Sequence, residues 1–122
     1  MDIRSFTRKD TTTVKIKNPL GIKTDASVEV YGTDSDQYKK ARIELARDFD
    51  SNDDESAMRK GATLIQSCIK SWENITDEGL PIDPHSKDAF AILVDPEFDY
   101  FVSQISNAMH NRTLFFSKSV KS

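Results

Sequence analysis

The chain has 122 residues, of which 37% are hydrophobic and 30% are charged, and this fits one domain with a single modest core. No apolar run approaches the roughly 20 residues of a membrane-spanning helix, and the N-terminus lacks the apolar stretch of a signal peptide, so we expect a soluble intracellular protein with no membrane partner. The net charge of −3 hides basic ends, residues 1–24 and 100–122, around an acidic middle, and without one concentrated basic face we expect no nucleic-acid partner.

Two alternating runs near the N-terminus predict a β segment over residues 12–32. In "TTVKIK", Val14 and Ile16 alternate with lysines, and in "SVEVY", Val28 and Val30 alternate with other residues. The turn-rich stretch "NPLG" lies between the two runs. We expect a β-hairpin or small sheet that packs on the helices after it, because a lone hairpin is marginally stable in water.

Two helices are predicted next, over about 35–48 and 55–73. Asp34, with Gln37 three residues later, resembles a capping box at the start of the first helix. The second helix carries the strongest apolar stripe of the chain, formed by Met58, Ala62, Ile65, Ile69 and Trp72. This spacing places Trp72 in the last turn of the second helix.

Two further helices are predicted over 86–94 and about 96–111, and residues 113–122 are predicted to be a flexible C-terminal tail. Either Asp83 or Ser86 caps the first of these helices, and Asp95 followed by proline ends it and starts the next. The sequence thus predicts a single domain over residues 1–112. Its expected class is α+β, mostly α, with the β-hairpin or small sheet packed on a four-helix domain.

The acidic stretch "DFDSNDDE" is the strongest metal candidate. Asp48, Asp50 and Asn52 match the first, third and fifth positions of a calcium-binding EF-hand loop. The match then fails, because Asp53 stands where the loop needs glycine and Arg59 stands where it needs glutamate. We therefore interpret these acids as a solvated connection between helices and predict no metal site.

Catalytic groups are not predicted either. Cys68 lies on the expected buried side of its helix, where a free cysteine behaves as a small hydrophobe, and neither His85 nor His110 has the sequence context of a catalytic base. Four acids surround a turn that contains glycine and proline and should face solvent, so they do not predict an acid–base pair: Asp77, Glu78, Asp83 and Asp88. No glycine-rich phosphate loop is present. We expect a protein that is not an enzyme and holds no cofactor.

Four apolar residues are candidates for partner binding. Trp72 is either a core anchor of its helix or a binding hot spot, and the core role is favoured because the stripe needs an anchor there. Leu114, Phe115 and Phe116 interrupt an otherwise polar tail, where they are either a docking element or a remnant of a longer product.

The order of these features is more specific than any one of them. A helix runs into a W-x-x-[IV]-x-D-x-x-G-x-P segment, a serine-capped helix follows, and a last helix starts near a proline; the residues are Trp72, Ile75, Asp77, Gly79, Pro81, Ser86, Ala89, Leu93 and Pro96. An upstream G-x-[DS]-S-x-x-Y-x-x-A element is carried by Gly32, Ser35, Tyr38 and Ala41. Over about residues 12–112 the chain resembles the tail assembly chaperones of long-tailed, siphovirus-like bacteriophages.

The resemblance implies a function in virion assembly, in the cytoplasm of the host cell. Such a chaperone binds the tape measure protein, recruits tail tube subunits of the same phage, sometimes associates with itself, and is absent from the finished virion. One alternative is a structural tail or head–tail completion protein that stays in the particle. Another is a small enzyme or regulator that uses the acidic loops, with or without a bound cation.

Overall fold

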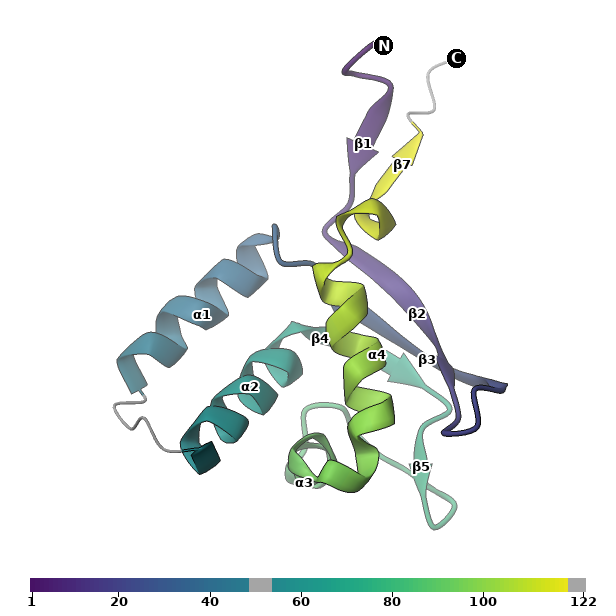
Figure 1. Ribbon diagram of the computed structural model, residues 1–122, viewed down its shortest axis with the longest axis vertical. Helices are drawn as coiled ribbons and strands as arrows, with labels where there is room; N and C mark the ends of the chain where they lie inside the picture. The colour runs from purple at the N-terminus through teal and green to yellow at the C-terminus, as the bar shows by residue number, and fades with distance from the viewer. Residues whose placement is uncertain (49–53, 119–122) are drawn as a thin grey trace.

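The computed structural model describes residues 1–48 and 54–118, and Figure 1 shows their arrangement. The elements follow in the order β1 (Phe6–Arg8), β2 (Thr11–Lys17), β3 (Lys23–Tyr31), α1 (Asp36–Asp48), α2 (Asp54–Cys68), β4 (Ile69–Glu73), β5 (Thr76–Asp77), β6 (Leu80–Pro81), α3 (Lys87–Val94), η1 (Pro96–Phe98), α4 (Asp99–His110), η2 (Arg112–Phe115) and β7 (Phe116–Lys118). Here η marks a short 3₁₀-helix. In the described residues, no helix has both the length and the apolar character that crossing a membrane requires.

A three-stranded antiparallel sheet in the order β2–β3–β4 forms the centre of the fold. Strand β3 lies in the middle, and Val28 and Val30 are completely buried on it. The residues of the predicted β segment thus form β2 and β3. Their connection is a tight turn in which the Asn18 side chain accepts hydrogen bonds from two backbone amides and Gly21 adopts a left-handed φ of 80°.

Helix α2 ends at Cys68, so the predicted helix over 55–73 is wrong in its last five residues. These residues form β4 and pair with β3, where Ile69 lies opposite Val30 and Trp72 lies opposite Val28. The helical spacing of Ile69 and Trp72 is coincidental. Pairing with the open edge of β3 satisfies backbone groups and buries Ile69, and this tertiary gain outweighs the local helical pattern.

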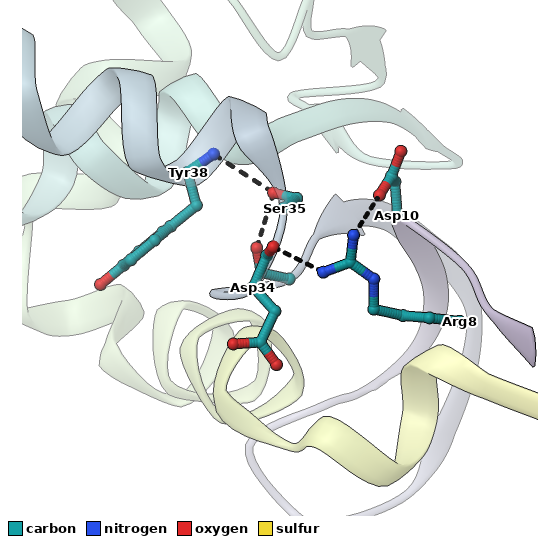
Figure 2. Close-up of polar contacts among 6 residues, drawn as sticks. Arg8, Asp10, Asp34, Ser35 and Tyr38 are labelled. Carbon is teal, nitrogen blue, oxygen red and sulfur yellow. Dashed lines mark hydrogen bonds and ion pairs between the residues drawn. The ribbon is translucent and has the colours of Figure 1, made fainter. Parts of the chain in front are cut away.

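The start of α1 also differs from its prediction, because Ser35 rather than Asp34 caps it. The Ser35 hydroxyl accepts a hydrogen bond from the Tyr38 amide at 3.2 Å and donates one to the carbonyl of Gly32 at 2.7 Å. Figure 2 shows this cap. Helix α3 is capped by Ser86, whose side chain accepts from the Ala89 amide, so of the two caps predicted for that helix the structure selects Ser86.

The main core lies between the sheet and α4, which packs along β2 and β3. Ile105 and Met109 of α4 are completely buried there, and Leu93 of α3 joins them. Helices α1 and α2 pack against each other, and α2 also contacts α3.

The two ends of the described chain pair with each other. Strand β7 runs antiparallel to β1, with Arg8 opposite Phe116 and Phe6 opposite Lys118. Residues 113–118 were expected in the flexible tail, but they form η2 and β7, and Phe115 is only 5% exposed. The long-range pairing and the burial of Phe115 account for this order.

The expected four-helix domain with a hairpin packed on it is wrong. The described residues form four α-helices and seven strands in three small sheets, which is a mixed α+β fold. The discrepancy arises because β4 replaces the end of the longest predicted helix and because β1, β5, β6 and β7 were not expected.

Candidate functional site

A groove with a cavity volume of about 330 Å³ opens between the tip of the β2–β3 hairpin, the β5–β6 hairpin and the start of α4. This volume is at the lower end of the range for small-molecule sites, about 300–1,000 Å³. Most of its walls are apolar, and they are lined by Ile16, Ala26, Ile75, Ile82, Ile92, Phe98, Tyr100 and Phe101. The polar lining comes from Lys17, Asn18, Thr24, Asp25, Asn74 and Thr76. An apolar floor with a polar rim is typical of a binding site.

The β5–β6 wall of the groove is held by Trp72. Its indole Nε1–H donates to the carbonyl oxygen of Ile82 at 2.6 Å, and its ring packs edge-on against Phe101 with 5.8 Å between centroids. This bond joins the two ends of residues 72–82 across the β5–β6 hairpin. Trp72 is therefore partly buried against the core, and its two partners Phe101 and Ile82 line the groove.

The turn of the β5–β6 hairpin has a specific backbone requirement. Glu78 and Gly79 have φ values of 50° and 82°, and two successive positive φ values are the signature of a type I′ turn. Asn74 enters the hairpin with a φ of 61°, and its side-chain amide donates to the carbonyl of Asp25 at 3.0 Å. That bond ties the segment leading into β5 to β3, and both Asn74 and Asp25 line the groove.

The opposite wall is tied to α4 through Gln104. Its side-chain oxygen accepts from the Lys17 amide at 2.8 Å, and its amide donates to the Lys17 carbonyl at 2.9 Å. These paired bonds satisfy the backbone of β2 beyond its regular pairing. The groove is thus bordered by segments that side chains hold in place.

Strands β1 and β7 form a second candidate surface, which we call the arm. Figure 1 shows the arm projecting from the body of the protein beside both termini, at the end of the long axis away from α3 and β5. Of the apolar run predicted to bind partners, Leu114 and Phe116 are 40% and 47% exposed at the base of the arm, whereas Phe115 is buried. The run therefore divides into one core residue and two residues available to a partner.

The catalytic candidates do not assemble into a site. Burial raises the pKa of the Cys68 thiol from 9.0 to about 11, which keeps it protonated and unreactive. His85 Nε2 donates to the carbonyl of Ile69, and His110 Nδ1 donates to the carbonyl of Ser106. Neither ring is hydrogen-bonded to Cys68 in the part of the chain that the structure describes. Among the described residues, Cys68 and the two histidines therefore form no nucleophile–base pair.

The acidic candidates are separate exposed side chains. Asp77, Glu78, Asp83 and Asp88 all face solvent. Within residues 1–48 and 54–118, no group of three or more His, Cys, Asp or Glu side chains is placed to hold a metal ion. Of the EF-hand candidate, Asp50, Asn52 and Asp53 lie outside the described residues.

The groove was missed by the sequence reasoning, because its lining residues come from six separate elements and turns. Of the lining residues, the sequence points to Ile16 in the alternating run and to Ile75 in the resemblance motif, neither of them as part of a groove. Comparisons with protein-family models, with curated proteins and with solved structures found no match to this chain.

Proposed function

We propose that the chain is a tail assembly chaperone of a long-tailed bacteriophage, acting in the host cytoplasm. In this role it binds the tape measure protein and recruits tail tube subunits, and it is not retained in the finished virion. The observation that carries the proposal is that the motif segment from Trp72 to Pro81 borders one side of the groove, with Ile75 lining the groove and Trp72 bonded to the lining residue Ile82. The chain is proposed to act by binding and not by catalysis.

The motif residues have consistent structural roles in that wall. Trp72 closes the segment through its bond to Ile82, Gly79 adopts the left-handed backbone of the turn, and Ser86 caps the helix that follows. Ile75 lines the groove itself. The tryptophan and glycine of the motif thus have structural roles in this wall and the serine caps the next helix, which supports the interpretation of the motif as one structural unit.

The groove suits reversible capture of an apolar segment. A chaperone of this kind must bind apolar side chains of its client while remaining dissolved. The groove supplies an apolar floor for such side chains, and the polar residues at its rim can bond to polar groups of the same client segment.

Co-expression with the tape measure and tail tube proteins of the same phage tests the proposal. We expect a tagged chain to co-purify with the tape measure protein, and a Thr76→Trp variant, which fills the groove from β5, to retain at least tenfold less. Ile43→Trp is the matched control, because it adds the same side chain at an exposed position of α1. A chain that binds neither protein would remove the proposal.

Mass spectrometry of purified virions checks the remaining part of the role. A chaperone is expected to be missing from the particle, while the tape measure and tube proteins are found. Detection of the chain at a fixed copy number in the virion would instead identify a structural tail or head–tail completion protein.

A further inference from the structure

The arm presents apolar and basic side chains on one face. Residues opposite each other in an antiparallel pair share a face, as do residues two apart in one strand. Phe6 lies opposite Lys118, and Arg8 lies opposite Phe116, so all four side chains belong to the same face. Phe6 and Phe116 are 52% and 47% exposed. This face therefore exposes two aromatic rings beside two cationic side chains.

The arm is fixed to the body at its base, as Figure 2 shows for Arg8. The Arg8 guanidinium donates to the carbonyl of Asp34 at 2.7 Å and lies 3.7 Å from the carboxylate of Asp10. The Lys9 amide donates to the carbonyl of Phe115 at 2.6 Å. A two-stranded ribbon is marginal by itself in water, and these bonds set the direction in which the arm projects.

The groove lies toward the opposite end of the long axis, and its surroundings are acidic. Residues 73–99, which form or flank two of its walls, contain eight Asp or Glu and one Lys. None of these eight carboxylates forms an ion pair within the described part of the chain. The opposite charges of Lys17 and Asp25, which lie on the β2–β3 wall, cancel each other. Leu80, which is 70% exposed, adds an apolar side chain at the tip of the β5–β6 hairpin.

We propose that the arm of one copy of this chain docks in the groove of a second copy. The aromatic rings of Phe6 and Phe116 match the apolar floor, and Lys118 on the same face of the arm matches the acidic rim. One copy cannot fill its own groove, because the arm and the groove lie toward opposite ends of the molecule. The contact is heterologous, so it continues from copy to copy into a ring or an open filament.

Sedimentation velocity on the purified chain alone tests this contact, independently of any phage partner. The arm variant is Phe6→Ser with Phe116→Ser, and the groove variant is Thr76→Trp. The matched control is Ile43→Ser with Met58→Ser, which removes two equally exposed apolar side chains from α1 and α2. Far-UV circular dichroism establishes that each variant is folded before its mass is measured.

We expect the wild type and the control to form larger species as concentration rises, and to lose them as salt rises from about 50 mM to about 1 M. The arm variant and the groove variant should each stay monomeric. A mixture of the two should give a one-to-one heterodimer of twice the monomer mass and nothing larger, because only one arm and one groove remain intact.

Three outcomes would overturn the proposal. The first is a wild type that stays monomeric at every concentration. The second is a groove variant that still associates, which would indicate an arm-to-arm contact. The third is a mixture of folded variants that fails to form the heterodimer.

Discussion

Gly32 is the position where the smallest substitution should have a clear effect on stability. A Cβ added at Gly32 would lie 2.9 Å from Cζ of Phe115 and 3.0 Å from Cε1 and Cε2. Carbon atoms in good contact are about 3.5–4.0 Å apart, so the ring would have to retreat by roughly 0.5–1 Å. Phe115 is a core residue whose carbonyl is bonded to Lys9, which limits that movement.

The expected loss for Gly32→Ala can be worked from two opposing terms. Overpacking a core costs about 1–3 kcal/mol. Gly32 does not have a left-handed φ. Replacing such a glycine with alanine stabilises the folded protein by about 0.4–1 kcal/mol, because it restricts the unfolded chain. The free energy of unfolding should therefore fall by about 1–2 kcal/mol, seen in urea titrations as a lower midpoint with an unchanged m-value.

Gly61→Ala is the matched control for this prediction. Gly61 is exposed within α2, and a Cβ there meets nothing within 4 Å. Alanine at that site should stabilise the protein by about 0.5–1 kcal/mol. The cost of Gly32→Ala should nearly vanish in a Phe115→Leu background, which lacks the three ring atoms. A Gly32→Ala protein with the wild-type midpoint or a higher one would refute the packing of Phe115 on Gly32.

Substitutions at three further positions examine the wall of the groove and the core. Trp72→Phe removes the donor to the Ile82 carbonyl and should lower the free energy of unfolding by about 1 kcal/mol. Unfolding is followed by circular dichroism, because this variant has no tryptophan left for fluorescence. Ser86→Ala should cost about 1 kcal/mol through loss of the α3 cap, and Ser86→Asp should restore most of it. The pKa of Cys68 is raised from 9.0 to about 11, so its contribution to stability is complete below pH 9.0 and falls as pH rises toward about 11. A Cys68→Ala variant should lack that part of the pH dependence in urea titrations, and an unchanged slope would contradict it.

Features encoded by a few neighbouring residues were predictable. The turn in "NPLG" follows from Asn18, which bonds its own downstream backbone, and from Gly21, which takes a left-handed φ. Asp95 and Pro96 start η1 as predicted for the next helix, since the Asp95 side chain accepts from the Glu97 amide. In each case the physical cause lies within four residues, so the sequence contains all of it.

Features that depend on distant partners were not predictable in the same way. Ile69 and Trp72 fit a helical stripe as well as they fit a strand, and the deciding factor is the open edge of β3, about forty residues earlier. The β-branched and aromatic character of these two residues was the available signal for a strand. The arm and the groove are even harder to predict from the sequence, because each brings together side chains whose proximity depends on the complete fold.

The run Leu114–Phe115–Phe116 shows how one short sequence serves both the core and the surface. Its three neighbouring side chains point out, in and out, since Phe115 is buried while Leu114 and Phe116 are exposed. Seating Phe115 on Gly32 fixes the backbone from which β7 leaves the body, and the Lys9 bond to the Phe115 carbonyl fixes β1 beside it. Displacing the ring should therefore tilt the arm as well as loosen the core. Gly32→Ala is thus expected to weaken the association of copies even without urea, where the protein stays folded. Gly61→Ala should leave this association unchanged. Equal association by both variants would show that the arm does not take its direction from Phe115.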